Sequence, residues 1–523
     1  MMKHEKFKLN INTAFKRRFS SGGQGALFFT ALFCIVAAIS CGKDKSKAHD
    51  ASPSSNSTKS IDSAASDKNN NTKAVSSSLQ TAPFAMPPFE KVLFVLVDAL
   101  RADKLGCYGF NEPTSPAIDK LAKESVLFEN VHAASPWTAP SFGTLFTGVS
   151  PSVHGAGKML GKHSKSGKSV HGVTVGGIRS DLPTLAELMP DTMKKAAVIN
   201  NSFVCKELGY AKGFDEFDFE LARLTSYRTA DEVTDIAINW LKKNKNKPFF
   251  YFLHYFDPHI QYAPPEKYLP MFAPNKPPRI AYPFVDHASA RDGSLNPNDS
   301  EKAYIRGLYH AEVRFVDDEL GRLLKYMKQE GLLENTWVVL ISDHGEELFE
   351  HGSFDHGHRY EEEVTRVPWI VRSPGGKWNA GKRISYNVSH VDVFATMLAL
   401  AGSDVPEHVE GTSVLPMVAG DETASRTSFM EFNLYRGQQC ALFDGQFKLI
   451  YDVRRESSFL YDLKTDPMEL TQLDKTHKMH LSLMSQITQK RNFLNKAVSG
   501  KTENSAVLSD ESRDALKSLG YIE

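Results

Sequence analysis

The feature that most constrains the fold of this chain is a series of short apolar runs separated by polar loops. Segments rich in Val, Ile, Leu, Phe and Ala occur at 92–97, 195–199, 249–253, 337–341 and 368–371. A strand with one face in water alternates apolar and polar residues, whereas a strand covered on both faces is apolar throughout. The runs therefore predict strands of a parallel sheet that is buried on both sides.

Helical segments lie between these runs. The apolar residues that recur at helical spacing across 309–328 give that segment one core-facing stripe: Val313, Val316, Leu320, Leu323, Leu324 and Met327. A second helix is expected at 391–402, and a strand-rich stretch at 446–461. The alternation predicts an α/β fold with a doubly wound, mostly parallel sheet and a small C-terminal α+β subdomain.

The N-terminus has the pattern of an export signal. Basic residues between positions 3 and 18 precede an apolar run at 26–39, which is too short to span a bilayer comfortably. The run leads through Ala38-Ile39-Ser40 into Cys41, which resembles the lipobox of bacterial lipoproteins. The resemblance implies an exported bacterial lipoprotein, held on the periplasmic or outer surface of a membrane by a lipid on Cys41. Ordinary cleavage nearby or an uncleaved anchor is the alternative.

Composition narrows the classes of partner. Lys+Arg and Asp+Glu are equal at 62 each, so no net charge favours a polyanion, and we expect no nucleic-acid partner. Beyond the N-terminal signal, three cysteines remain, Cys107, Cys205 and Cys440. Their wide spacing excludes a disulfide framework and a CxxC metal pair.

Acidic residues directly follow two of the predicted strands. Asp98 comes after the first run, and Asp343 with His344 comes after the fourth. In an open α/β sheet, ligands bind beyond the carboxyl ends of the strands, where such residues can converge. Two carboxylates and one imidazole suit one divalent ion, Ca, Mn, Mg or Zn. A helix cap is the alternative role for any single one of these acids.

A hydroxyl-bearing motif lies at 135–148. Its first part is Thr138-Ala139-Pro140-Ser141 and its last part is Leu145-Phe146-Thr147-Gly148. This resembles the sulfatase branch of the alkaline phosphatase superfamily, whose signature is Cys or Ser, any residue, Pro-Ser, Arg, and a helix ending Thr-Gly. Four further segments resemble the same family in the same order: 97–109, 254–259, 342–346 and 460–469. The resemblance covers nearly all of residues 91 to 475.

Two departures from this pattern bear on mechanism. Thr138 replaces the Cys or Ser that the family oxidises to formylglycine, and Phe142 replaces the arginine four residues later. Threonine carries a methyl group on Cβ, so no formylglycine is expected. Threonine is the nucleophile in related phosphodiesterases and phosphoglycerol transferases. This implies that Thr138 is itself a ligand of the metal, is activated by it and forms a covalent intermediate.

The resemblance also implies residues that contact an anionic substrate. His259 matches a histidine that contacts the substrate oxyanion or protonates the leaving group, with a structural histidine as the alternative. His356 and His358 lie where relatives have a lysine or histidine on the anion. Arg101 could contact the anion or cap its own loop. Asp257, His259 and His356 could build a second metal centre, although we prefer one metal.

Composition and the resemblance together divide the chain into five parts. We expect a signal peptide with lipobox at 1–41, a disordered tether at 42–88, the main part of a sulfatase-like catalytic domain at 89–375, the end of that domain with the C-terminal subdomain at 376–480, and a helical or irregular tail at 481–523. The tether is expected because 42–88 has almost no large apolar side chains to bury.

Three functions are compatible with these residues. The first is a metal-dependent hydrolase of phosphate or sulfate esters that uses Thr138, and we favour phosphorus. The second is a sulfuric ester hydrolase that works without formylglycine. The third is a catalytically degenerate lipoprotein that binds anions or glycans. The substrate expected for the first two is an anionic ester on a glycan, a lipid or a small molecule.

Overall fold

The computed structural model describes residues 89–158, 174–219, 227–432, 434, 438–502 and 504–507. The predicted signal peptide, Cys41 and the tether lie outside these residues. Within the described part of the chain, no helix is both long enough and apolar enough to cross a membrane.

An eight-stranded sheet forms the centre of the fold. Only β10 runs against its neighbours, and the other strands share one direction. The strand order across the sheet is β11 (Arg383–Ser389), β2 (Val126–His132), β10 (Arg366–Arg372), β7 (Trp337–Ser342), β1 (Lys91–Val97), β6 (Phe249–Tyr255), β4 (Lys194–Ile199) and β5 (Glu216–Phe219). All five apolar runs form strands of this sheet, so the predicted class, α/β with a mostly parallel sheet, is confirmed.

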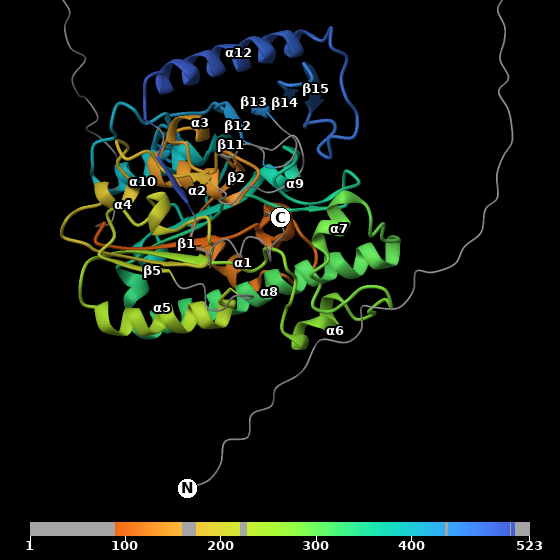
Figure 1. Ribbon diagram of the computed structural model, residues 1–523. Helices are drawn as coiled ribbons and strands as arrows, with labels where there is room; N and C mark the ends of the chain where they lie inside the picture. The colour runs from red at the N-terminus through yellow and green to blue at the C-terminus, as the bar shows by residue number, and fades with distance from the viewer. Residues whose placement is uncertain are drawn as a thin grey trace, which may run out of the picture. The chain divides into compact units, whose positions relative to one another are not determined.

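Helices cover both faces of the sheet, as Figure 1 shows. One face packs against α1 (Pro116–Lys123), α5 (Ala230–Asn244), α6 (Leu269–Phe272), α7 (His287–Asp292) and α8 (Asp299–Gln329). The other packs against α2 (Thr138–Thr147), α4 (Leu185–Leu188), α10 (His390–Ala401) and α11 (Leu415–Ala419). Alternate residues of β1 enter the two cores, with Phe94 in one and Val95 in the other. This burial on both sides is why the strands are apolar throughout.

A second, smaller sheet follows in the chain. Its antiparallel strands are β12 (Ser428–Glu431), β13 (Gln439–Phe443), β14 (Phe447–Asp452) and β15 (Ser457–Asp462), in that order. The helix α12 (Lys478–Val498) packs on this sheet through Leu483 and Ile487, and lies at the top of Figure 1. The small C-terminal subdomain is therefore confirmed as helix on sheet.

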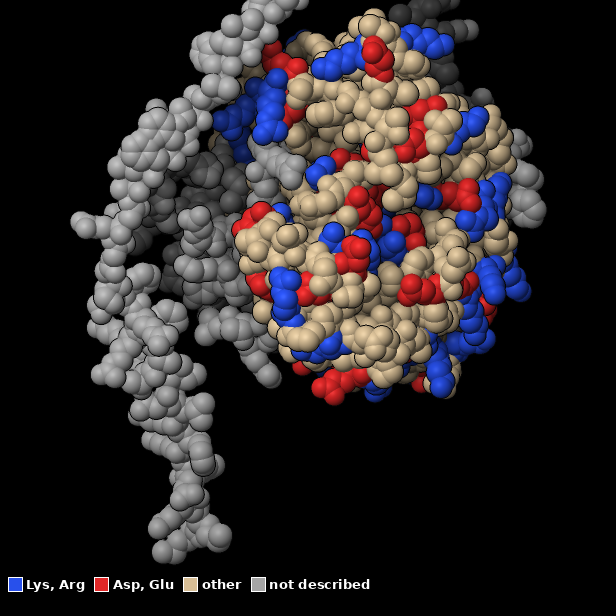
Figure 2. Space-filling view, turned by 90° about the vertical axis from the view of Figure 1, so that its right-hand side faces the viewer, with Lys and Arg blue, Asp and Glu red and all other residues tan. Residues whose placement is uncertain are grey.

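Shorter elements complete the described chain. They are α3 (Pro151–His154), β3 (Thr174–Gly176), β8 (Glu347–Leu348), β9 (Phe354–Asp355), α9 (Glu362–Thr365) and β16 (Ser505–Val507). Six short 3-10 helices lie between them and the longer elements: η1 (Ala102–Lys104), η2 (Gly106–Tyr108), η3 (Lys206–Leu208), η4 (Glu266–Tyr268), η5 (Leu332–Glu334) and η6 (Pro374–Gly376). On the face shown in Figure 2, lysine and arginine side chains are interspersed with aspartate and glutamate. This mixture matches the equal numbers of basic and acidic residues in the chain.

Candidate active site

Asp98, Asp343 and His344 come together at the carboxyl edge of the large sheet. Asp98 follows β1 and the other two follow β7, which is paired with β1. One ligand atom from each residue lies within 4.8 Å of the others, and all three side chains are fully buried. The convergence expected at adjacent strand ends is thus present.

The polar atoms of this group leave a place for a cation. Asp98 Oδ1 and Asp343 Oδ2 are buried without a hydrogen-bond partner, and each lies 3.4 Å from His344 Nε2. A buried carboxylate oxygen without a partner is costly, and a divalent ion would satisfy both oxygens at once. The donor set of two carboxylates and one imidazole therefore fits one divalent metal ion.

Neighbouring groups aim the two carboxylates. Asp343 Oδ1 accepts hydrogen bonds from the backbone N–H groups of Ala99, at 3.2 Å, and His344, at 3.0 Å. Ala99 has a φ of 55°, in the left-handed region, and this turn directs its N–H toward Asp343. With Oδ1 held in this way, Oδ2 faces the candidate metal position.

Asp98 is held by His254 through a defined tautomer. The backbone N–H of Asn200 donates to His254 Nδ1 at 3.3 Å, so the imidazole proton is on Nε2. Nε2 donates to Asp98 Oδ2 at 3.2 Å, which leaves Asp98 Oδ1 facing the metal position. His254, expected to be structural, thus orients a candidate metal ligand.

Burial dominates the pKa values of these groups. It raises the pKa of Asp343 to about 8, with a further rise from the charge of Asp98, and it raises the pKa of Asp98 well above its usual value. Burial also lowers the pKa of His344 to about 4. Without a metal, the site therefore favours protonated carboxylates and a neutral imidazole.

Thr138 is the first residue of α2 and lies beside the ligand group. Its Oγ1 is 3.3 Å from His344 Nε2 and 3.4 Å from Asn201 Nδ2, and the side chain is 1% exposed. The N-terminus of a helix favours negative charge because its backbone N–H groups lack partners. Thr138 is therefore placed where an anionic group would be stabilised.

Phe142, one turn further along α2, is a core residue. Its ring is fully buried and makes an edge-to-face contact with His254, with 5.0 Å between ring centroids. The position at which the family pattern has arginine therefore supports His254 by packing and supplies no charge to the site.

His259 and His356 pack close to His344. The ring centroid of His356 lies 4.4 Å from that of His344 and 4.8 Å from that of His259. His259 Nδ1 donates to the carbonyl of Ile260 at 2.5 Å, so Nε2 is its acceptor nitrogen. Burial lowers the pKa of His259 well below its usual value and that of His356 to about 4. Both histidines are neutral near pH 7.

A second group of possible metal ligands differs from the set predicted from the sequence, which was Asp257, His259 and His356. Glu346, Asp355 and His356 have ligand atoms within 4.8 Å of one another. Asp355, however, is already paired with the guanidinium of Arg291. Asp257 is in neither group of possible metal ligands found among the described residues, and its Oδ2 accepts from the first N–H of α5, that of Ala230, at 2.7 Å.

Arg101 and His358 are each held by polar groups other than Thr138. The guanidinium of Arg101 is buried and pairs with Asp103 and Glu350 at 2.8 and 2.6 Å, which matches the loop-capping alternative. His358 Nε2 bonds Glu347 at 2.8 Å, and its Nδ1 bonds the carbonyl of His356 at 3.0 Å. The contact of either residue with substrate stays a prediction.

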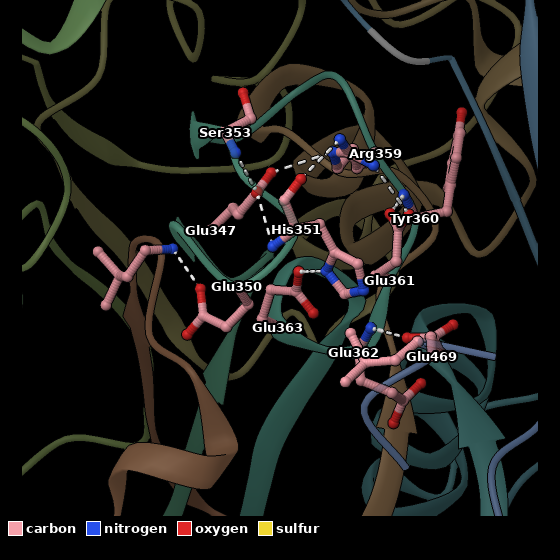
Figure 3. Close-up of polar contacts among 12 residues, drawn as sticks. Glu347, Glu350, His351, Ser353, Arg359, Tyr360, Glu361, Glu362, Glu363 and Glu469 are labelled. Carbon is pink, nitrogen blue, oxygen red and sulfur yellow. Dashed lines mark hydrogen bonds and ion pairs between the residues drawn. The ribbon is translucent and has the colours of Figure 1, made fainter. Parts of the chain in front are cut away.

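A cluster of glutamates supports the loop after the metal ligands. The N–H groups of Gly345 and Glu346 donate to the carbonyls of Val364 and Glu363 at 2.7 and 2.9 Å. In Figure 3, the carboxylate of Glu363 bonds the imidazole of His351, and the backbone N–H of Glu362 donates to the carboxylate of Glu469. Residues 362–364 thus connect the loop after Asp343 and His344 to the C-terminal subdomain.

Sequence reasoning missed Asn201. It is the second residue after β4, so the same strand-end rule that selected Asp98 could have found it. Its side chain is 2% exposed, and its Nδ2 donates to Asp98 Oδ2 at 3.2 Å. Asn201 lies between Asn200 and Ser202, in no motif that predicts a ligand or a catalytic group, which is why the sequence did not single it out.

Comparisons with known proteins agree with this fold. The sequence profile of the family described as "Sulfatase" matches residues 90–403, more than half of the chain. A profile described as "N-sulphoglucosamine sulphohydrolase, C-terminal" matches residues 349–496. The chain therefore belongs to the sulfatase family, and is an ester hydrolase of that family with a buried Asp/His cluster consistent with a metal site.

Its relatives are distant. The chain is 27% identical to an uncharacterized sulfatase of Escherichia coli (strain K12) over 447 residues, which cover 75% of this chain and 86% of that protein. A solved structure of BT4656 in complex with its substrate D-glucosamine-2-N,6-O-disulfate has a TM-score of 0.62 at 21% identity, covering 78% of this chain and 99% of the other. The phosphonate monoester hydrolase of Agrobacterium radiobacter has a TM-score of 0.60 at 20% identity, covering 78% and 95%.

Proposed function

We propose that this protein hydrolyses phosphate esters of sugars or similar small molecules through a covalent intermediate on Thr138. The observation that carries the proposal is the position of Thr138 Oγ1, which lies 3.3 Å from His344 Nε2. That nitrogen also faces the two unpartnered oxygens of Asp98 and Asp343. A hydroxyl beside a candidate metal site and at a helix N-terminus is suited to nucleophilic attack on an anionic ester.

The reaction proceeds by two displacements at phosphorus. Thr138 Oγ1 attacks, an Oγ1–P bond forms, and the bond from phosphorus to the leaving alcohol breaks; the hydroxyl proton lost from Thr138 is balanced by the one that the leaving alkoxide takes up. Water then attacks the same phosphorus, the Oγ1–P bond breaks, and Thr138 regains a proton as phosphate leaves. His259, with Nε2 as its acceptor nitrogen, is our choice for taking up the proton that Thr138 releases and passing it to the leaving alkoxide.

Asp98, Asp343 and His344 would hold one divalent ion beside Thr138. Bound there, it would lower the pKa of an adjacent hydroxyl and stabilise negative charge on the transferring oxygens. The chain's own contribution is to aim those ligands, through His254 and through the N–H groups of Ala99 and His344.

Phosphorus is preferred over sulfur because of how the intermediate must break down. A hydrated aldehyde carries a second hydroxyl that can expel sulfate by elimination, and Thr138 has no such group. An ester on Thr138 must instead be attacked by water at the central atom, which metal-dependent phosphoester chemistry allows. The substrate of BT4656 is a sulfated glucosamine, so sulfate esters of sugars are the second candidate.

A paired substrate panel separates the two candidates. Purified protein with added Mn, Mg, Ca or Zn is assayed on an aryl sulfate, an aryl phosphate, a phosphodiester and a phosphonate monoester that share one leaving group. We expect the phosphorus substrates to turn over faster. Dominant sulfatase turnover would overturn the preference for phosphorus.

The nucleophile is tested with Thr138→Ala and a matched control. Thr147→Ala removes a second buried hydroxyl of α2, which donates to the carbonyl of Gly143 at 2.6 Å and lies at the other end of the helix. We expect the Thr138→Ala variant to lose turnover and the control to keep it. Mass spectrometry of protein quenched with a slow substrate should show the added group on Thr138. Full activity of the Thr138→Ala variant would refute the assignment, and absence of turnover in the wild type, with metal bound, would favour a binding lipoprotein.

We also propose that the protein is exported and anchored by a lipid on Cys41. The support is the sequence pattern of a basic stretch, an apolar run and Cys41. Expression of the full chain and of Cys41→Ser in a bacterial host, followed by membrane fractionation and mass analysis, tests this. Equal membrane association of the two proteins, with no lipid mass on the wild type, would contradict it.

A further inference from the structure

We infer that a pocket at the edge of the large sheet opposite to Thr138 binds a small molecule in which an oxyanion group, a phosphate, phosphonate or sulfate, is joined to an apolar body. The pocket has a volume of about 630 Å³, within the range of pockets that bind small organic ligands. The inference does not rest on the proposed function, because the residues that line the pocket have no part in the attack by Thr138.

The pocket lies between α1, the C-terminal part of α8 and the turn that follows β10. The two helices pack side by side on one face of the sheet (Figure 1), and Gly321 lets them approach closely, since a Cβ there would lie 3.0 Å from that of Ala117. Leu333 and Glu334 line the pocket and precede β7, whereas Asp343 follows β7. The length of this strand, about 20 Å, therefore separates the pocket from the candidate metal ligands.

The inner wall of the pocket is apolar. Leu121 and Leu333 are buried and belong to the core on this face of the sheet, and Ala117 and Leu324 are half-buried beside them. Covering such a concave wall with an apolar group removes both surfaces from water, which is favourable. The wall therefore suits the apolar body of a ligand.

Basic side chains outnumber acidic ones around this wall. The lining holds four basic and two acidic side chains: Lys120, Lys325, Lys328 and Arg372 against Glu124 and Glu334. Glu124 is paired with Arg372 at 3.0 Å, whereas none of the three lysines forms an ion pair with any residue that the structure describes. Positive charge gathered on a concave surface attracts anions. The charged part of the ligand is therefore an anion.

Arg372 provides a fixed donor for this anion. The residue is 4% exposed; its Nε donates to Glu124 at 3.0 Å, and its Nη1 donates to the carbonyls of Leu333 and Ser373 at 2.8 and 3.2 Å. Its Nη2 donates to no group within the described part of the chain. A guanidinium held by three bonds on one side presents its remaining N–H groups in a fixed direction, which suits the oxygens of a phosphate or sulfate group.

Gly376 keeps this donor uncovered. The residue lines the pocket and has a φ of 61°, in the left-handed region. A Cβ at this position would lie 2.9 Å from Arg372 Nη2 and 3.1 Å from Glu124 Oε2. Any side chain here would therefore press on the guanidinium and cover Nη2, whereas glycine leaves that nitrogen open to the pocket.

Hexylphosphonate is a suitable probe, because it joins an oxyanion to an apolar chain and has no ester bond to hydrolyse. We expect it to protect the amides of 321–334 and 372–376 from hydrogen exchange in the purified, metal-supplied protein. The concentration at which this protection is half complete gives the affinity of the pocket itself. Inorganic phosphate, which lacks the apolar chain, should bind more weakly.

Reversing the charge of two lysines tests the site without disturbing the core. Lys325 and Lys328 are exposed, and the double variant Lys325→Glu with Lys328→Glu turns two attractions for the anion into two repulsions. We expect the local affinity for hexylphosphonate to fall about 10-fold. Arg372→Lys keeps a positive charge but removes Nη2, so it should weaken binding as well; the exposed lysine pair tests the pocket even if this variant does not fold.

The double variant Lys242→Glu with Lys243→Glu is the matched control. These two lysines are also exposed, lie in the last turn of α5 on the same face of the sheet and are not among the residues that line the pocket. The control changes the net charge of the protein by the same amount as the test variant. We expect it to keep the local affinity of the wild type for hexylphosphonate.

Three results would overturn the inference. The first is an absence of protection at 321–334 and 372–376, or equal local affinities in the wild type and the Lys325→Glu, Lys328→Glu variant. The second is equal binding of inorganic phosphate and hexylphosphonate, which would show that the apolar wall takes no part. The third is binding of the wild type, but not of that variant, to vesicles containing phosphatidylglycerol while hexylphosphonate gives no protection; the lysines would then belong to a membrane-binding surface.

Discussion

Lys448 lets us test how strongly the C-terminal subdomain is tied to the active-site loop. Its Nζ, on β14, is fully buried and lies 2.7 Å from Glu362 and 3.0 Å from Glu469. It also donates to the carbonyl of Tyr360 at 3.0 Å. Although burial alone would lower its pKa, the two carboxylates raise the pKa of Lys448 above its usual value. The Lys448 ammonium is therefore charged, and it faces the carboxyl groups of Glu362 and Glu469.

Replacing Lys448 with methionine keeps the volume and removes the charge. Glu362, whose side chain is 20% exposed, would then lose its main cation. Breaking a fully buried pair from one side costs about 3–5 kcal/mol, and the partial exposure of Glu362 places the expected loss near the lower end, at about 3 kcal/mol. The double variant Lys448→Met with Glu362→Gln should recover most of this loss, because neither charge remains. Lys490→Met is the matched control: Lys490 pairs with Glu410 at 2.6 Å in a partly exposed position, where about 0–1 kcal/mol is expected.

The stability lost in the Lys448→Met variant should depend on pH in a definite direction. Without Lys448, the pKa of Glu362 rises in the folded state while that of the unfolded chain stays near its usual value. The unfolded state of the variant then binds fewer protons than its folded state. The variant therefore loses stability relative to the wild type as pH rises. Denaturant unfolding followed by circular dichroism at about pH 5 and about pH 8 should show the larger loss at the higher pH. A loss no greater than that of Lys490→Met at both pH values would refute the reasoning.

Three further predictions concern the site itself. Because burial raises the pKa values of Asp98 and Asp343, divalent metal binding at pH 7 should release protons, and its affinity should rise with pH up to about 8; titration calorimetry in buffers of different ionisation enthalpy would show no proton release if this is wrong. His254→Gln should weaken metal binding about 10–100-fold, whereas His480→Gln, in the C-terminal subdomain, should leave the measured metal affinity unchanged. Arg101→Gln should lower the melting temperature and leave KM for anionic substrates unchanged; a rise in KM without loss of stability would restore Arg101 as a substrate ligand.

Much of this protein was determined by local sequence pattern. An apolar run reports burial on both faces without knowledge of any partner, so the strands and the α/β class could be predicted from 92–97 and its counterparts. The rule that ligands bind beyond strand ends then selected Asp98, Asp343 and His344, which the structure brings together. The motif around Thr138 pointed to the family, and the methyl group on Cβ of threonine is the reason why no formylglycine is expected at that position.

The tertiary structure decided what each polar side chain does. Asn201 and Asp98 are 103 positions apart and meet only because β4 and β1 flank β6. Arg101 looked available for an anion until the fold placed Glu350 beside it. A local pattern gives the direction of a side chain from its own strand or helix, whereas its hydrogen-bond partners come from segments that only the packed sheet brings close. The role of a buried polar group depends on those partners, and so it becomes visible only in three dimensions.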